Sequence, residues 1–320
     1  MQRIVVEAPG GPDAMRLETA APAPPGPGEV CIRHAAIGVN MIDTYHRSGL
    51  YPLRAPYGLG LEAAGTVEAV GEGVPGLAPG DRVVYFTTAT GSYATHRTIP
   101  AAAAVRLPPW LGEETAAAVW LKACTAEFLV ERCARVRPGQ WVLVTAAAGG
   151  VGLLLLQWLK AVGAHAIGVV SPGKEEAARA AGAAHVLSYD RMPEAVRDLT
   201  GGRGVDVVID GVGKATFERA LDSLCRRGLH ISFGNASGPI GPVDFSILAF
   251  KGSLFTTRPT LFDYYAEPED FTRGTTRVLE MLEKGLLTVT IGQRYPLAEA
   301  ARCHRDLEAR RTIGSTILLP

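Results

Sequence analysis

The sequence predicts an α/β protein in which a β-rich domain is combined with a doubly wound parallel sheet. Short β-branched runs separated by Gly/Pro-rich turns fill the chain to about residue 121. From about Cys124 apolar runs alternate with amphipathic segments, which is typical of βαβ units. A glycine-rich turn joins an apolar strand to a helix within residues 141–160. The length of 320 residues fits two packed domains.

The composition favours an enzyme with substantial cores, since 47% of the residues are apolar and 20% are charged. The 32 basic residues are balanced by 32 acidic ones, so nucleic acid is an unlikely partner. The five cysteines are odd in number and contain no C-x-x-C pair. This pattern favours reduced thiols and a cytoplasmic location.

No membrane partner is predicted. The amino-terminal run MQRIVVEAPGGPDAMRLE places charged residues around a short strand and lacks the apolar core of a signal peptide. The most apolar helical segment, Val151–Leu159, is far too short to span a bilayer.

In the first part of the chain the β-branched runs predict strands at Arg3–Val6, Val30–His34, Thr66–Val70 and Arg82–Tyr85. In the second part the alternating pattern predicts strands at Trp141–Ala146, Ala166–Val170, His185–Ser188, Val205–Asp210, Leu229–Phe233 and Lys251–Arg258. The helices expected between and after them are Val151–Val162, Lys174–Ala181, Pro193–Leu199, Phe217–Arg226 and Thr272–Lys284. Gly228 is expected to cap the helix before it in the left-handed conformation. A helix at Leu297–Arg311 and a strand at Thr316–Leu319 are expected to return to the first domain.

The segment WVLVTAAAGGVGLLLLQWLK has the strand–turn–helix context of a dinucleotide site. Gly149 and Gly150 would let the backbone approach a pyrophosphate, and Gly152 would let the helix pack tightly on the sheet. The helix amino terminus then offers N–H groups and partial positive charge to the phosphates. The alternative is an ordinary strand-to-helix turn, but the βαβ series that follows favours the cofactor site.

NADPH is the favoured cofactor. NAD-preferring enzymes carry an acidic residue at the end of the second strand, where this chain reads GVVSPGK. Ser171 replaces the acid, and Lys174 lies within reach of a 2′-phosphate. The alternative for Lys174 is a solvated residue in the first turn of a helix.

The chain resembles the quinone oxidoreductases of the medium-chain dehydrogenase/reductase superfamily, the zinc-free group that includes zeta-crystallin. The segments that carry the resemblance are IGVNMIDTYHRSGLYP, GLGLEAAGTVEAVGEGV, GDRVVY, AAAGGVG, RRGLHISFGNASG, KGSLFTTRP and LEARRTIGSTILL. Together they extend over nearly the whole chain. They are far more specific than the glycine turn alone.

The resemblance implies a GroES-like catalytic domain, formed by residues 1–122 and 261–320, and a Rossmann domain formed by residues 123–260. It also implies a homodimer, with the strand near Lys251–Thr257 as the joining edge, which is compatible with the need to cover an edge strand.

The site residues follow from the same resemblance. The implied catalytic residues are Asn40, Asp43, Tyr45 and Tyr51. Cofactor contacts are implied for Asn40, Met41, Thr44, Tyr45, Thr125, Gly149, Gly150, Val151, Phe233, Gly234, Asn235, Arg258 and Pro259, with Lys174, Tyr189 and Arg310 around the 2′-phosphate. The end of the second strand itself adds Ser171 to this set. The alternative is that the tyrosines only pack and that Asn40 and Asp43 only make turn hydrogen bonds.

No zinc is predicted. Asn40 stands where zinc alcohol dehydrogenases carry a thiolate, and Leu61 precedes Glu62 where they carry a histidine. Such a pair cannot complete the usual tetrahedral ligand set. We expect Glu62 to be a hydrogen-bonded structural carboxylate.

The resulting hypothesis is zinc-independent, NADPH-dependent reduction of a quinone or a related electron-poor small molecule, by electron or hydride transfer. Quinones and conjugated enones need less help from a Lewis acid than alcohols do, because the oxyanion formed when they accept a hydride is already delocalised. Two alternatives stay open: reduction of an enone or alkenal double bond, and a non-enzymatic NADPH-binding role of the RNA-binding or crystallin type.

Overall fold

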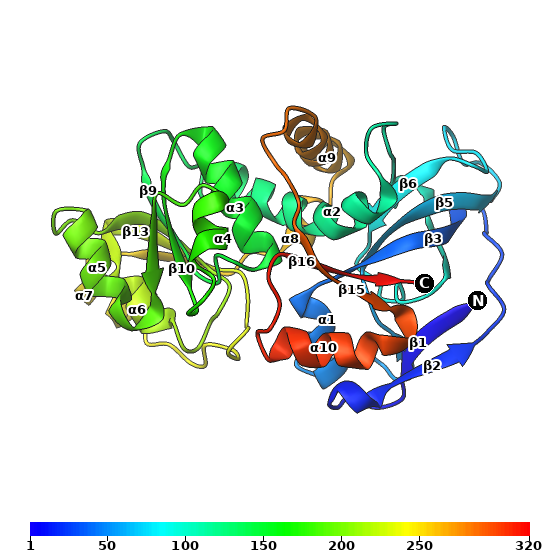
Figure 1. Ribbon diagram of the computed structural model, residues 1–320, viewed down its shortest axis with the longest axis horizontal. Helices are drawn as coiled ribbons and strands as arrows, with labels where there is room; N and C mark the ends of the chain where they lie inside the picture. Colours follow the sequence, from blue (N-terminus) through cyan, green and yellow to red (C-terminus); the bar gives the residue numbers. More distant parts are fainter. The chain divides into compact units, whose positions relative to one another are not determined.

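The computed structural model describes all 320 residues and divides into two compact units. The first unit comprises Met1–Leu121 and Val289–Pro320, so it contains both ends of the chain; the second unit comprises Lys122–Thr288. Figure 1 shows the first unit at the blue, cyan and red ends of the colour scale and the second unit from green to orange. The expected α/β class is confirmed.

The second unit is built on six parallel strands in the order β11-β10-β9-β12-β13-β14. Their bounds are β9 Trp141–Val144, β10 His165–Val170, β11 His185–Ser188, β12 Val205–Asp210, β13 Leu224–Ser232 and β14 Phe255–Thr257. Since β9 comes first in the chain and has later strands on both sides, the strand order reverses there. In doubly wound sheets a ligand binds at this reversal, outside the carboxyl ends of the strands.

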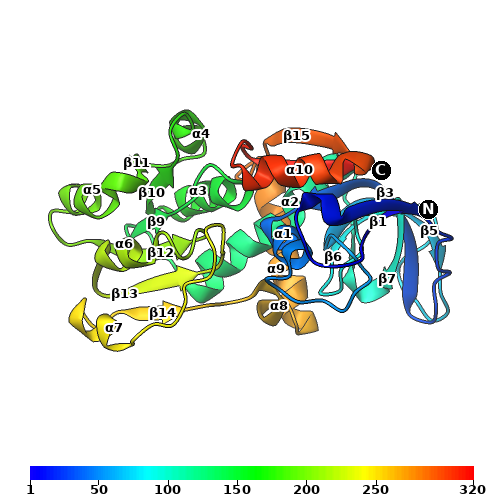
Figure 2. The ribbon, with the colours of Figure 1, turned by 90° about the horizontal axis from the view of Figure 1, so that it is seen from below.

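Helices cover both faces of this sheet. Their bounds are α3 Gly150–Val162, α4 Glu175–Ala180, α5 Met192–Leu199, α6 Phe217–Asp222 and α7 Ser246–Phe250. Helix α3 packs with α4 and α5 packs with α6, and Figure 2 shows the two pairs on opposite sides of the sheet. The core between sheet and helices includes Leu143, Ile167 and Val208, all fully buried.

The first unit contains two mainly antiparallel sheets. The larger one has the order β15-β16-β3-β5-β6-β8, with β7 also paired to β3, and the smaller one has the order β2-β1-β4. The strands of the larger sheet are β3 Glu29–Val39, β5 Glu62–Val70, β6 Arg82–Phe86, β7 His96–Pro100, β8 Ala104–Arg106, β15 Ile291–Pro296 and β16 Ser315–Leu319. Those of the smaller sheet are β1 Gln2–Val6, β2 Met15–Thr19 and β4 Tyr57–Gly58. Because β16 pairs with β3, the carboxyl-terminal segment completes the amino-terminal sheet.

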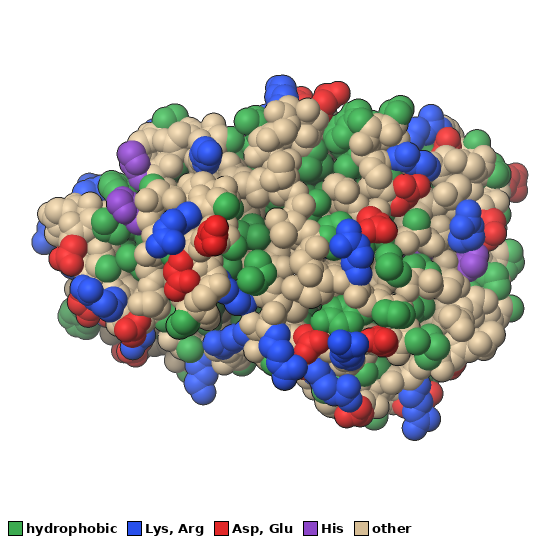
Figure 3. All heavy atoms as spheres, viewed as in Figure 1, with side chains coloured by type: hydrophobic (Ala, Val, Ile, Leu, Met, Phe, Trp, Pro, Cys, Tyr) green, Lys and Arg blue, Asp and Glu red, His purple; other side chains and the backbone are tan.

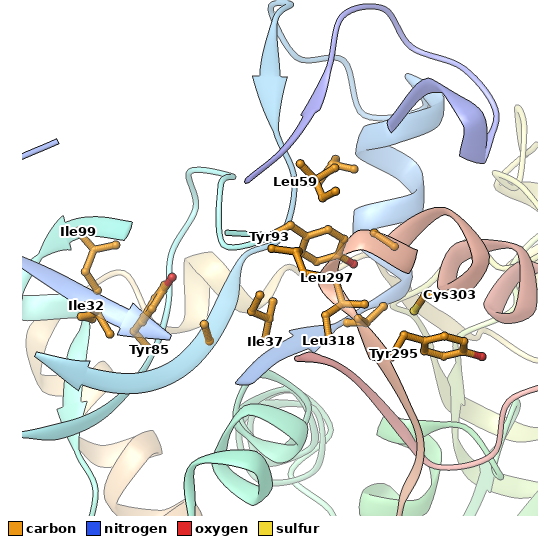
Figure 4. Packing of buried hydrophobic residues seen from close by; sticks show 14 of the residues in the cluster. Ile32, Ile37, Leu59, Tyr85, Tyr93, Ile99, Tyr295, Leu297, Cys303 and Leu318 are labelled. Carbon is orange, nitrogen blue, oxygen red and sulfur yellow. The ribbon is translucent and has the colours of Figure 1, made fainter. Parts of the chain in front are cut away.

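Two helices of the first unit, α1 Met41–Ser48 and α10 Ala300–Glu308, pack against each other. A buried core lies between the sheets and α10, and Figure 4 shows Tyr93 beside Leu59 and Leu297 in this core. Tyr85 lies in another part of the same core, beside Ile32 and Ile99.

The second boundary between the units falls after Thr288 rather than after residue 260. The segment in question contains α8 Leu261–Tyr264 and α9 Pro268–Glu283. It is held to the second unit by two acidic residues at the end of α2 (Glu113–Glu127) and in the π-helix Phe128–Cys133 that follows. The Tyr265 hydroxyl donates to Glu127 at 2.7 Å, and Arg277 Nε donates to Glu131 at 2.9 Å. The first boundary falls after Leu121, one position from the expected one.

Two local expectations are corrected. Helix α6 ends at Asp222 rather than at Arg226, and strand β13 begins at Leu224 and runs through Gly228, which is not a left-handed cap. The left-handed residue is Arg227, with φ 59°, within β13 where its register with β12 shifts. Strand β14 is limited to Phe255–Thr257 because the residues before it form α7 and a turn.

None of the helices is long and apolar enough to cross a membrane.

Candidate functional site

The glycine-rich turn leads from β9 into α3 with the geometry that a pyrophosphate site requires. Gly149 is the amino-terminal cap of α3, and Ala146 adopts a left-handed conformation with φ 50°. A Cβ on Gly152 would lie 2.4 Å from the Ala146 carbonyl oxygen, so only glycine lets α3 come this close to the turn. The turn is tied to β10 by the Ala147 N–H, which donates to Val169 O at 3.1 Å.

Strand register brings the predicted 2′-phosphate residues of the second unit to the same edge of the sheet. Val170 at the end of β10 pairs with Ser188 at the end of β11, so Ser171 and Tyr189 follow neighbouring strand ends. Lys174 caps the amino terminus of α4, three residues after Ser171. No acidic residue stands at the end of β10, which reads VVSPGK.

Tyr189 also contacts the glycine-rich turn. The backbone N–H of Ala146 donates to the Tyr189 hydroxyl oxygen at 2.9 Å. The Tyr189 carbonyl oxygen accepts a bond of 2.8 Å from Arg219 Nη1. This side chain therefore links the predicted 2′-phosphate side of the site to the pyrophosphate turn.

A buried carboxylate, which sequence reasoning did not single out, organises the adjoining strand ends. Asp210, at the end of β12, accepts hydrogen bonds from the hydroxyls of Thr145 at 2.6 Å and Thr216 at 2.8 Å. Burial alone raises the pKa of Asp210, but the nearby His230 Nε2 at 3.7 Å and hydrogen bonds from Thr145, Thr216 and the Val212 N–H hold it below its ordinary value. The signal was present as an acid directly before the glycines of IDGVG.

The predicted nicotinamide-side loop lies next to this carboxylate. Ser232 pairs with Asp210, so Phe233, Gly234 and Asn235 follow the end of β13 at the same edge. A Cβ on Gly234 would lie 2.3 Å from Gly211 O, so the two loops make close backbone contact. Arg258 Nη1 reaches back to Ser232 O at 2.8 Å and Gly234 O at 3.1 Å, with Pro259 following it. Thr125 also belongs to the second unit, where it is buried on α2.

In the first unit the predicted catalytic segment forms the start of α1. The Asp43 carboxylate accepts from the Asn40 N–H at 2.8 Å, as in a capping box. The Nδ2 of the Asn40 side chain donates to Glu62 Oε1 at 2.8 Å. The Thr44 hydroxyl donates to the Met41 carbonyl oxygen at 2.7 Å.

The two predicted donor tyrosines lie together. The rings of Tyr45 and Tyr51 make an edge-to-face contact with centroids 5.4 Å apart, and the Tyr51 N–H donates to Tyr45 O at 3.0 Å. The structure therefore brings Asn40, Asp43, Tyr45 and Tyr51 into one short segment. Arg310 also lies in the first unit, two residues after α10, with φ 59°.

The residues at the position of the superfamily's catalytic zinc do not fit a zinc ion. Glu62 is fully buried, and its second oxygen accepts from the Leu121 N–H at 2.7 Å, so N–H donors already contact both oxygens. The expectation that Glu62 is a hydrogen-bonded structural carboxylate is confirmed. Its neighbour Asn40 carries an amide and supplies neither a thiolate nor an imidazole. No group of three His, Cys, Asp or Glu side chains is arranged to hold a metal.

Comparison with known families gives two matches that together span most of the chain. The profile of the alcohol dehydrogenase GroES-like domain matches residues 26–109. The profile described as zinc-binding dehydrogenase matches residues 150–268, in the second unit.

Similar proteins extend over the full length. The chain is 47% identical to a quinone oxidoreductase of Pseudomonas aeruginosa, over all of this chain and 99% of that protein. It is 40% identical to a 2-haloacrylate reductase of a Burkholderia species, over 99% of this chain and 98% of that protein. The solved structure of Escherichia coli quinone oxidoreductase complexed with NADPH matches with a TM-score of 0.98 and 43% identity, covering both chains completely.

The two quinone oxidoreductases are 47% and 43% identical to this chain and match it over its full length. The GroES-like profile coincides with the unit that carries Asn40 and Glu62, and the dehydrogenase profile coincides with the unit that carries the glycine-rich turn. The chain therefore belongs to the quinone oxidoreductases of the medium-chain dehydrogenase/reductase superfamily.

Proposed function

We propose that this protein is an NADPH-dependent quinone reductase. The observation that carries the proposal is the full-length similarity to quinone oxidoreductases, one of them solved with NADPH. The second unit supports it with a glycine-rich turn at the strand-order reversal and with Ser171 in place of an acidic residue. The overall reaction converts NADPH, a proton and a quinone into NADP⁺ and a quinol.

The cofactor site is assigned to the carboxyl edge of the parallel sheet. Gly149, Gly150 and Val151 would hold the pyrophosphate through backbone N–H groups at the start of α3. Lys174 and Tyr189 would bind the 2′-phosphate through charge-assisted hydrogen bonds, and the family resemblance adds Arg310 to them. The nicotinamide side would be lined in the second unit by Phe233, Gly234, Asn235, Arg258, Pro259 and Thr125. The family resemblance adds Met41 and Thr44.

The acceptor side is assigned to the Asn40–Tyr51 segment. When bound, NADPH supplies the reducing equivalents from C4 of its nicotinamide. Asn40 has a second N–H beside the one given to Glu62, and Tyr45 and Tyr51 have hydroxyls that can donate to a quinone oxygen. Their task is to orient the acceptor and stabilise the charge that develops on its oxygen. Asp43 fixes the helix start on which these groups stand.

The test is a stopped-flow experiment with metal-stripped protein, NADPH and 1,4-naphthoquinone, following nicotinamide absorbance. We expect rapid oxidation of NADPH, slower oxidation of NADH, and reduced rates for Tyr45→Phe and Tyr51→Phe. Turnover that requires added zinc, or no turnover with any quinone, would contradict the proposal.

Reduction of an activated carbon–carbon double bond is the second candidate. It is favoured by the 2-haloacrylate reductase among the relatives. Parallel initial rates with 2-chloroacrylate and short 2-alkenals decide between the two, because the quinone reductase assignment requires the quinone to be the faster substrate.

We further propose a homodimer joined through β14, and a cytoplasmic location. Strand β14 is the outer strand of its sheet, and Phe245, Phe250 and Phe255 near it are 71%, 87% and 60% exposed. Such an edge is normally covered.

The cytoplasmic location is supported by the five cysteines, none of which forms a disulfide. Basic and acidic side chains are interspersed over most of the face in Figure 3, which agrees with a small-molecule partner rather than nucleic acid.

A further inference from the structure

A chain of buried polar groups runs from α10 to the start of α1 within the first unit. Arg47 Nη1 lies 3.3 Å from His304 Nδ1, and His304 Nε2 lies 3.0 Å from the Tyr93 hydroxyl. The Tyr93 hydroxyl lies 3.0 Å from Asp43 Oδ2. Tyr93, His304 and Asp43 are completely buried, and Arg47 is nearly so.

The hydrogen-bond directions along this chain follow from the donor inventory of each group. Arginine has no acceptor, so its guanidinium donates and His304 Nδ1 must carry a lone pair. A neutral imidazole then has its proton on Nε2, which donates to the Tyr93 oxygen. The Tyr93 proton is thereby directed to Asp43 Oδ2. Every bond points from Arg47 toward Asp43.

Charge and burial agree with this direction. Burial, together with the nearby Arg47, lowers the pKa of His304 to about 3, so the ring stays neutral. Burial and Asp43 raise the pKa of Tyr93 well above its ordinary value, so the phenol keeps its proton. Arg47 is itself fixed by Glu308 through contacts of 2.6 and 3.0 Å.

The chain ends on the segment that we assign to the reaction. Asp43 Oδ2 also accepts from the Asn40 N–H, and the Asn40 side chain is bonded to Glu62. Tyr45 follows Asp43 by two residues in the same helix. A displaced Asp43 would therefore move the backbone that carries both Asn40 and Tyr45.

We propose that Tyr93 and His304 are positioning residues of the quinone reductase reaction, holding Asp43 and so the start of α1 by a one-directional hydrogen-bond chain. This inference rests on the proposed function. Neither side chain contacts the acceptor in this scheme, since both are completely buried. They act through Asp43.

A matched pair of variants tests the proposal. Tyr93→Phe removes one hydroxyl from this chain. Tyr85→Phe removes an equally buried hydroxyl that contacts another histidine, His34 Nε2 at 2.9 Å, and Figure 4 shows Tyr85 in a different part of the core. We expect both to lower the unfolding temperature. Only Tyr93→Phe should lower kcat, by about tenfold, which corresponds to the loss of one buried hydrogen bond. The Kd of NADPH should stay within about twofold of the wild-type value.

The histidine supplies a rescue experiment. Gln at position 304 can keep a donor near the Nε2 position, whereas Met fills the space without one. His304→Gln should retain more of the wild-type kcat than His304→Met. Equal kcat for Tyr93→Phe and Tyr85→Phe would overturn the positioning role.

A measurement on the wild-type protein does not depend on turnover. Nitrogen-15 NMR of labelled histidine should show His304 as the Nε2–H tautomer from pH 5 to 9, with the signal identified by its absence in His304→Gln. An Nδ1–H tautomer, or titration in this range, would reverse the direction of the chain and overturn the proposal. If wild type fails to reduce any quinone while this tautomer is observed, the proposed function fails and the hydrogen-bond chain stands.

Discussion

At the level of single residues, we propose that Ser171 and Lys174 carry the cofactor preference. An acidic side chain at the end of β10 would accept hydrogen bonds from a ribose and repel a 2′-phosphate. Ser171 removes that repulsion, and Lys174 at the cap of α4 adds a positive charge three residues later. Strand register places Tyr189 beside this pair, so three side chains of the second unit share one edge.

Lys174→Ala should weaken NADPH binding by about tenfold while changing NADH binding by less than about twofold, because a charge-assisted hydrogen bond contributes about 1.5–3 kcal/mol. Adding Arg310→Ala should bring the total loss for NADPH to about a hundredfold or more. Fluorescence titration with each cofactor measures both constants. The control is Lys284→Ala, at an exposed lysine after α9. Equal losses for NADPH and NADH would refute the assignment.

At the scale of elements, the approach of α3 to the glycine-rich turn depends on Gly152. The residue has no space for a Cβ, which would meet Ala146 O at 2.4 Å and Ala147 Cα at 2.7 Å. Both contacts are with backbone, so relief requires α3 to move away from the turn. The helix amino terminus would then lose its alignment with the phosphates.

Gly152→Ala should therefore lower the free energy of unfolding by about 1–3 kcal/mol, the usual cost of overpacking, and weaken NADPH and NADH alike. Urea unfolding and fluorescence titration measure the two effects. Gly11→Ala is the control, because Gly11 has φ −67° and no atom within 4 Å of the added Cβ. Unchanged cofactor binding in a folded Gly152→Ala protein would contradict the role given to this glycine.

Some strands and helices could be predicted from the sequence and others could not. The expected strands His185–Ser188 and Val205–Asp210 coincide with β11 and β12, because buried parallel strands read as continuous apolar runs. Helix α1 carries Asp43, Thr44, His46 and Arg47 as buried polar residues, so its buried face has no apolar stripe. This helix, which begins after Asn40 and ends at the left-handed Gly49, was not predicted from the sequence.

Long-range polar contacts are the part that the sequence could not supply. Tyr93 and His304 are 211 residues apart, and neither stands in a motif that indicates a bond between them. The partners of Asp210 likewise come from the residue after β9, from the start of α6 and from β13. Periodicity identifies strands and their order, whereas such contacts depend on the exact packing of the strands.

For the molecule as a whole, two buried neutral histidines make stability depend on pH. Burial lowers the pKa of His34 and of His304 to about 3. In the unfolded chain a histidine takes up a proton below about pH 6.5. Between that value and pH 3 the unfolded state binds protons that the native state does not. The free energy of unfolding therefore decreases as the pH is lowered through this range.

Each histidine should contribute a slope of about 1.4 kcal/mol per pH unit in this range and none above it. His304→Gln removes one such contribution. The difference in unfolding free energy between wild type and His304→Gln should thus be constant from pH 7.5 to 8.5 and should shrink from pH 6 to 5. Urea unfolding at these four pH values measures it, and a difference that stays constant throughout would show that His304 is not buried uncharged.

The unpaired edge of β14 predicts how two copies of the chain would assemble. Phe255 lies on β14, which pairs only with β13 and leaves its other edge without a strand. Joining two copies at this edge would bury Phe255 and the exposed phenylalanines of the preceding segment.

Phe255→Lys places a charge in that interface, and a buried unpaired charge costs several kcal/mol. The variant should therefore sediment as a monomer in sedimentation velocity at about micromolar concentration, where the wild type sediments as a dimer. Leu17→Lys, a similarly exposed position on the edge strand β2, should leave the dimer intact. A wild-type monomer, or a Phe255→Lys protein that sediments as a dimer, would exclude β14 as the joining edge.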